Sequence, residues 1–192
     1  MHSGRFAILA GVICWLAVLT VGCRPSAKPG EGDQDSSLSA TDASALGDLL
    51  TDDSGKFSYR MPAGWSAVKI PGNSFKVAVE PEQSGYRANI QVSREAVPRR
   101  FDLFVEESRK SLLKLQSGAM IREDSAFTTS AGLEGRRWIV NVFQNGERLW
   151  QAYYLVPGPN DDKLVVTMTA RTDQELHLTY VSDICMKTLV VR

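Results

Sequence analysis

The sequence predicts an α+β fold in which an antiparallel sheet carries helices on both of its faces. Short segments that alternate apolar and polar residues are separated by turns rich in Pro, Gly and Asn, which is typical of an antiparallel meander. One long hairpin has apolar side chains on both faces, and such a sheet needs a covering layer on each side. Two further segments show the 3.6-residue period of amphipathic helices, which supply those layers.

The N-terminus has the pattern of a lipoprotein export signal. Arg5 precedes a run of 16 uncharged residues, 6–21, which suits the apolar region of a signal peptide and is short of the roughly 20 residues of a membrane-spanning helix. Gly22-Cys23 follows, as at a lipoprotein signal peptidase site, although Leu19 stands one position earlier than the usual bulky aliphatic residue. We therefore predict that residues 1–22 form a signal peptide and that Cys23 is lipidated. An uncleaved N-terminal anchor is the alternative, and Arg24 disfavours it because positive charge prefers the cytoplasmic flank.

Residues 23–55 are predicted to be a disordered acidic tether. From residue 24 to 55 there are two basic and seven acidic residues, and few side chains that build a core. Residues 56–192 form the predicted globular domain, with 19 basic and 15 acidic residues. The resulting net charge of 19 − 15 = +4 is spread over the domain, whereas a nucleic-acid-binding surface has clustered basic residues. We therefore expect no nucleic-acid partner.

The first half of the domain is expected to be a meander followed by a helix. Alternation predicts strands at 57–60, 65–70, 75–80 and 88–93, with a turn at 61–65 where Pro62 and Gly64 suit the backbone. A helical stripe follows, made of Phe101, Phe104, Val105, Ser108, Leu112 and Leu115. A further strand is predicted over 120–129.

The strongest local signal is a hairpin over 136–157. Its arms meet at Asn145-Gly146, the dipeptide best suited to a two-residue type I′ turn. That turn sets the register, which places Val142 opposite Leu149, Val140 opposite Gln151, Trp138 opposite Tyr153, Ile139 opposite Ala152 and Arg137 opposite Tyr154.

The chain closes with a strand over 163–171 and a helix. Thr172-Asp-Gln-Glu175 fits a capping box that starts this helix. Its buried stripe is predicted to consist of Leu176, Tyr180, Val181, Ile184 and Cys185, and residues 189–191 then pack or pair as a short tail. Cleavage would remove Cys14 and lipidation would occupy Cys23, so we expect Cys185 to be a buried, protonated and inert single thiol.

The opening segment Phe57-Ser-Tyr-Arg-Met-Pro-Ala-Gly-Trp65, followed by this order of elements, resembles the PsbP-like superfamily. That superfamily includes extrinsic photosystem proteins, Mog-type import factors that bind Ran, and bacterial lipoproteins of the DcrB and LpqN type. The resemblance covers about residues 56–192. It implies an α/β/α sandwich around a twisted antiparallel sheet, and it implies no activity, because no functional motif can be matched position by position.

The residues that catalysis or metal binding would need are scarce. The mature chain has one histidine, His177, so a multi-histidine metal site is excluded by count. His177 and Cys185 lie eight residues apart, about 12 Å along a helix, which is too far for a Cys–His nucleophile pair. A Ser-His-Asp triad through His177 stays open, but no Gly-x-Ser-x-Gly turn accompanies it. We expect no enzyme activity, no cofactor and no metal.

Two basic pairs, Arg99-Arg100 and Arg136-Arg137, are the candidate contact surface, with plain solubility as the competing interpretation. The sequence favours a non-enzymatic binding or assembly module of the cell envelope. It would be anchored through Cys23 in the cell membrane or at the periplasmic face of an envelope membrane. Its partners would be the lipid bilayer and an envelope protein. A small-ligand carrier with a pocket between sheet and helix is the alternative, and an envelope hydrolase is the third possibility.

Overall fold

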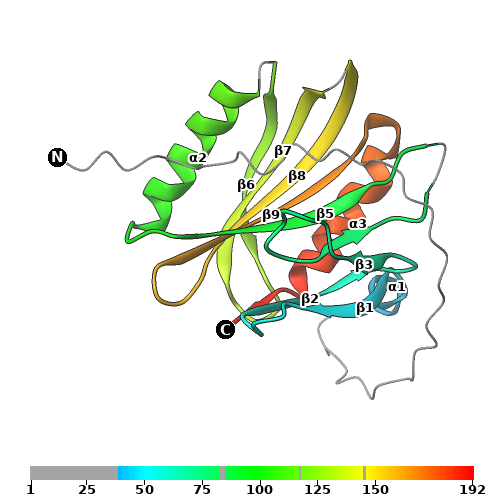
Figure 1. The fold of residues 1–192 in the computed structure, drawn as a ribbon, viewed down its shortest axis with the longest axis horizontal. Coiled ribbons are helices and arrows are strands. Elements are labelled where there is room, and N and C mark those ends of the chain that lie inside the picture. The colour runs from blue at the N-terminus through cyan, green and yellow to red at the C-terminus, as the bar shows by residue number, and fades with distance from the viewer. Residues whose placement is uncertain (1–38, 83–84, 117, 145) are drawn as a thin grey trace.

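The chain folds around a seven-stranded antiparallel sheet of order β3-β4-β5-β9-β8-β7-β6 (Figure 1). The structure, a computed structural model, describes residues 39–82, 85–116, 118–144 and 146–192. The strands of this sheet are β3 (Ser66–Val68), β4 (Val77–Val79), β5 (Asn89–Ala96), β6 (Met120–Thr128), β7 (Glu134–Gln144), β8 (Glu147–Pro157) and β9 (Asp162–Arg171). A second sheet, β1-β2-β10, consists of β1 (Leu46–Thr51), β2 (Phe57–Pro62) and β10 (Val190–Val191). The helices are α1 (Ala40–Ser44), α2 (Phe101–Leu115) and α3 (Glu175–Lys187).

The predicted hairpin is confirmed in its register. Every predicted pair between β7 and β8 is present, from Val142 opposite Leu149 to Arg137 opposite Tyr154. Gly146 has a φ of 84°, the left-handed conformation that the turn needs from a glycine. Asn145, the other half of the turn, lies outside the described residues.

Helices cover both faces of the large sheet, as the two apolar faces of the hairpin predict. On one face Phe104 and Leu112 of α2 join Trp138, Val140 and Tyr153 in a core cluster. A larger cluster fills the other face, where α3 packs between the large sheet and β2; its members include Phe57, Tyr59, Ile139, Trp150, Tyr154, Val166, Met168, Val181 and Cys185. The fold is therefore the predicted α/β/α arrangement, with the small sheet packed against α3.

Helix α2 begins and ends where its period predicts, whereas the strands before it differ in length. The predicted strands at 65–70 and 75–80 shorten to the three-residue strands β3 and β4. Strand β5 instead extends to Ala96, because eight of its residues pair with β9. The closing tail packs and pairs: Leu189 is buried, and β10 adds to the edge of β2.

Order begins earlier than the sequence predicts, so the tether boundary at residue 55 is wrong. Strand β1 pairs antiparallel with β2 and places Leu50 in the core, 3% exposed. Asp52 donates its backbone N–H to Phe57 and accepts from the Ser54 N–H, which closes the β1–β2 turn. The prediction fails because pairing with β2 compensates for the Gly and Asp residues that make this segment a poor strand by itself. The predicted signal peptide, Cys23 and residues 24–38 lie outside the described residues.

The start and the outer face of α3 also differ from prediction. Thr172–Gln174 forms a 3₁₀ turn, and the residue before α3, Gln174, makes no side-chain capping bond. The capping box is absent because the Glu175 carboxylate is held by Arg122 instead. Leu176 and Tyr180 are exposed, since they project from the side of α3 opposite to Leu178, while Val181, Ile184 and Cys185 are buried as predicted. Within the described part of the chain, no helix is long and apolar enough to span a membrane.

Candidate functional site

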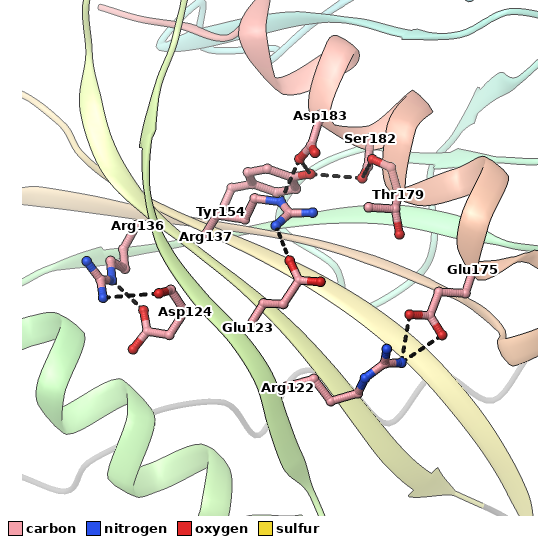
Figure 2. A network of polar contacts seen from close by, with 10 residues as sticks. All are labelled: Arg122, Glu123, Asp124, Arg136, Arg137, Tyr154, Glu175, Thr179, Ser182 and Asp183. Atoms are coloured by element: carbon pink, nitrogen blue, oxygen red, sulfur yellow. Dashed lines mark hydrogen bonds and ion pairs between the residues drawn. The ribbon is translucent and has the colours of Figure 1, made fainter.

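The two arginines of the second predicted pair lie on opposite faces of the large sheet. Arg136 and Arg137 are neighbours in β7, and side chains alternate between the faces of a strand. Arg137 therefore points to the face covered by α3, and Arg136 to the face covered by α2. Figure 2 shows that Arg136 contacts Asp124, whereas Arg137 contacts Glu123 and Asp183.

Arg137 joins the sheet to α3. Its Nε donates to Asp183 of α3 at 2.6 Å and its Nη1 to Glu123 of β6 at 2.9 Å. The Tyr154 hydroxyl also donates to Asp183 at 2.5 Å and shares a hydrogen bond with Ser182 at 2.8 Å. The Arg137 side chain is 11% exposed, so this ion pair lies largely out of water.

Two pKa values in this cluster are raised, in the direction that keeps the network intact. Burial, reinforced by the negative charge of Asp183, raises the pKa of Tyr154 well above its usual value, so the phenol stays protonated and donates. Burial opposes the charge of Arg137, but Glu123 and Asp183 overcome it and hold the pKa of the guanidinium above its usual value. The cluster is a protonated phenol and a fixed cation that converge on one carboxylate.

Arg136 belongs to a second network, centred on Asp124 of β6. The Asp124 carboxylate accepts from Arg136, from the Trp138 indole N–H at 2.9 Å, and from Arg109 of α2 at 3.3 Å. A third link, from Arg122 Nη1 to both carboxylate oxygens of Glu175 at 2.7 and 2.9 Å, joins β6 to the first turn of α3. Strand β6 is the edge of the sheet, and these contacts attach it to a helix on each face.

The first predicted pair lies at the start of α2. Arg99 forms an ion pair with Glu107, and Arg100 forms one with Asp102 at 2.7 Å. These carboxylates supply the reason for arginines at a helix N-terminus, where positive charge alone is unfavourable. Arg100 is the most accessible of the four arginines, with 79% of its side chain exposed.

The structure thus separates the four arginines that the sequence groups as a contact surface, and each of them holds a carboxylate. Sequence reasoning missed Asp124 and Asp183, because single acidic residues far apart in the chain form no motif, and it gave Glu175 a capping role in place of its ion pair with Arg122. The predicted register did carry one signal, since it placed Arg137 opposite Tyr154 on a face that a helix has to cover. Whether these arginines contact a partner stays a prediction.

The residues considered for catalysis lie apart. His177 is exposed on the outer side of α3, whereas Cys185 is fully buried. Burial raises the pKa of the Cys185 thiol to about 12, so it is protonated at neutral pH. The Ser182 hydroxyl is engaged by Tyr154 and by the Thr179 carbonyl at 2.9 Å. Among the described residues, no group of three or more His, Cys, Asp or Glu is placed to hold a metal ion.

Comparison with known proteins shows a shared fold at low identity. No protein-family model matches the chain, and no curated protein matches it significantly. LpqN of Mycobacterium tuberculosis, described as involved in cell envelope biogenesis, aligns at 15% identity and a TM-score of 0.57, over 70% of this chain and 82% of its own. Cyanobacterial PsbP (CyanoP) of Synechocystis aligns at 13% identity and a TM-score of 0.58, over 77% of this chain and 94% of its own. The Saccharomyces cerevisiae Ran-binding protein Mog1p aligns at 13% identity and a TM-score of 0.54, over 76% of this chain and 96% of its own. The chain therefore has the PsbP/Mog-like fold that its opening segment resembles.

Proposed function

We propose that this protein is a lipoprotein, anchored in an envelope membrane through Cys23, that acts as a non-enzymatic binding or assembly module. The observation that carries the proposal is the apolar run 6–21 that ends in Gly22-Cys23, ahead of an ordered domain. The shared fold supports it, because LpqN is described as involved in cell envelope biogenesis and Mog1p as Ran-binding. These descriptions belong to the relatives, and they show that this fold serves in the envelope and in protein recognition.

The earlier start of order shortens the proposed tether. Between Cys23 and Ser39 lie the 15 residues 24–38, for which a flexible chain has an end-to-end distance of roughly 20 Å. The domain would stay close to the membrane surface, and that confinement raises its effective concentration for a membrane-resident partner. Weak contacts then suffice for a functional complex.

The contact surface in this proposal includes the exposed members of the arginine pairs, Arg100 above all. Charge reversal in Arg100→Glu is expected to reduce recovery of an envelope partner, while the melting temperature stays unchanged because this ion pair is exposed. Arg137→Glu is a poor probe, since it breaks a largely buried ion pair and unsettles the fold.

A small-ligand carrier is the second candidate function, and one observation favours it. The Tyr59 hydroxyl and the Trp150 indole N–H are fully buried in the core between α3 and the sheet. Neither has a hydrogen-bond partner among the described residues. Buried polar atoms without partners are costly, and a ligand held in this layer would satisfy them.

Anchoring is tested by comparing two cysteine substitutions in the cells that produce the protein. Cys23→Ser should move the protein from the membrane and detergent phase to the aqueous phase, because it removes the thiol that carries the lipid. Cys14→Ser is the matched control, since it changes a cysteine inside the signal sequence and should leave partitioning unchanged. Equal partitioning of Cys23→Ser and the parent protein would reject the anchor.

A further inference from the structure

Four large apolar side chains lie exposed at one end of the molecule. They are between 47% and 60% exposed, and we call them the apolar end: Leu113, Leu115, Met120 and Phe143. The last turn of α2, the start of β6 and the adjoining ends of β7 and β8 gather at this end, at the top of Figure 1. Strand pairing agrees, because Met120 is opposite Asn141 and Phe143 is opposite Arg148, next to the turn.

Two members of the apolar end share a face with buried residues of the same element. Leu115 lies on the same helical stripe as Phe104, Ser108 and Leu112, which are buried against the sheet, yet it is 59% exposed. Phe143 lies on the face of β7 that α3 covers, beyond buried Ile139 and half-buried Asn141, and it is 60% exposed. Met120 points to that same face from the adjacent strand, diagonal to Phe143. Exposed apolar side chains thus lie at the end of the α3-facing side of the sheet and at the last turn of α2.

Basic side chains flank these apolar ones. Lys114 stands between Leu113 and Leu115, and Arg148 is the cross-strand neighbour of Phe143. Neither cation forms an ion pair within the described part of the chain, and both are exposed. Arg122 and Glu175 pair with each other at the same end, so they add no net charge. Apolar side chains that insert below the headgroups, with Lys and Arg extended to the phosphates, are the pattern of interfacial membrane binding.

We propose that the apolar end docks on the surface of an anionic lipid bilayer. Phe143, Met120 and Leu115 insert at the boundary between headgroups and acyl chains, while Lys114 and Arg148 contact lipid phosphates. The domain then stands with its sheet ends on the membrane and presents its other surfaces outward. This orientation extends the proposed function, since the 15 residues between Cys23 and Ser39 reach up to about 50 Å when extended. That reach exceeds the width of a domain of this size, roughly 30–40 Å from its radius of gyration.

The test uses residues 23–192 with Cys23→Ser, which keep every described element and carry no lipid. Binding is measured by co-sedimentation with vesicles of phosphatidylethanolamine and phosphatidylglycerol, and with vesicles of phosphatidylcholine alone. We expect binding to the anionic vesicles that salt weakens, and weaker binding to the neutral ones. Phe143→Ser should lower partitioning about tenfold, because it removes most of one aromatic side chain from the inserted area.

The matched controls are Leu49→Ser and Leu103→Ser, two exposed leucines outside the apolar end, which should leave vesicle binding unchanged. The proposal is wrong if the parent chain ignores anionic vesicles, or if the controls lose as much binding as Phe143→Ser. It is also wrong if the parent is a dimer in solution that Phe143→Ser converts to a monomer without altering vesicle binding, since a second copy then covers this end. Because the chain in this assay has no lipid anchor, its outcome does not depend on whether Cys23 is modified.

Discussion

Removal of the Asp183 charge is the sharpest test of how α3 is held on the sheet. In Asp183→Asn the Arg137 guanidinium, 11% exposed, loses its charged partner on α3, and the Tyr154 hydroxyl loses its carboxylate acceptor. Breaking a fully buried pair from one side costs about 3–5 kcal/mol. Asp183 retains a third of its side-chain exposure, so we expect a smaller loss, about 2 kcal/mol of the free energy of unfolding. For a domain of this size, that loss lowers the melting temperature by roughly 4–8 °C.

Glu123→Gln provides the matched control, because Glu123 binds the same arginine from the sheet edge with 54% of its side chain exposed. Its loss should cost less than about 1 kcal/mol. Thermal and urea unfolding of the two variants side by side gives the comparison. If Asp183→Asn melts with the parent, or if Glu123→Gln costs as much, then Arg137 is not the buried link between α3 and the sheet.

Three further outcomes follow from the described structure. Leu50→Ala should lower the free energy of unfolding in urea by about 2–3 kcal/mol, because Leu50 is buried in β1. The control Leu49→Ala changes an exposed residue of the same strand and should stay within about 0.5 kcal/mol of the parent. Equal effects of the two substitutions would mean that β1 does not pack on the core. Gly146→Ala should lower the free energy of unfolding by about 1–2 kcal/mol, since a φ of 84° is strained for any residue with a side chain. An unchanged unfolding midpoint would contradict the left-handed conformation of Gly146. For Cys185, burial raises the folded-state pKa from 9.0 to about 12, so its contribution to stability is complete below pH 9 and is lost as pH rises toward 12. The difference in the free energy of unfolding between the parent and Cys185→Ala should therefore become smaller from about pH 8 to about pH 10.5. Rapid labelling of the thiol in the native protein at pH 8 would refute its burial.

The parts of the fold predicted best are those set by local chemistry. Asn145-Gly146 determines a turn length, and the turn length determines which residues of β7 and β8 face each other, so one dipeptide yields the register of the longest hairpin. The two apolar faces of that hairpin then require two covering helices. Helix α2 was predictable because its period is uninterrupted from Phe101 to Leu115.

The parts predicted poorly depend on tertiary contacts. Strand β1 exists because β2 offers an edge and Leu50 finds the core, and neither fact is visible in a segment that contains Gly47 and Asp48. Leu176 and Tyr180 are apolar or aromatic residues on a helix, yet the sheet reaches only the side of α3 that carries Leu178 and Val181. The sequence did not reveal how far each covering layer extends.

The arginine pairs show the same limit at the candidate site. Arg136 and Arg137 are adjacent in the sequence, which predicts one basic patch, but successive side chains of a strand lie on opposite faces of the sheet. Their partners Asp124 and Asp183 come from β6 and α3, and only the assembled fold brings them within hydrogen-bond distance.

The intact mass of the protein isolated from its native membranes shows whether a lipid on Cys23 holds this domain at a membrane. We expect a chain that begins at Cys23, with a mass above that of residues 23–192 by the mass of the attached acyl and glyceryl groups. Treatment that hydrolyses ester-linked acyl chains should remove part of that excess. A mature protein that retains residues 1–22, or one that begins at Cys23 with no added mass, would rule out the lipid anchor.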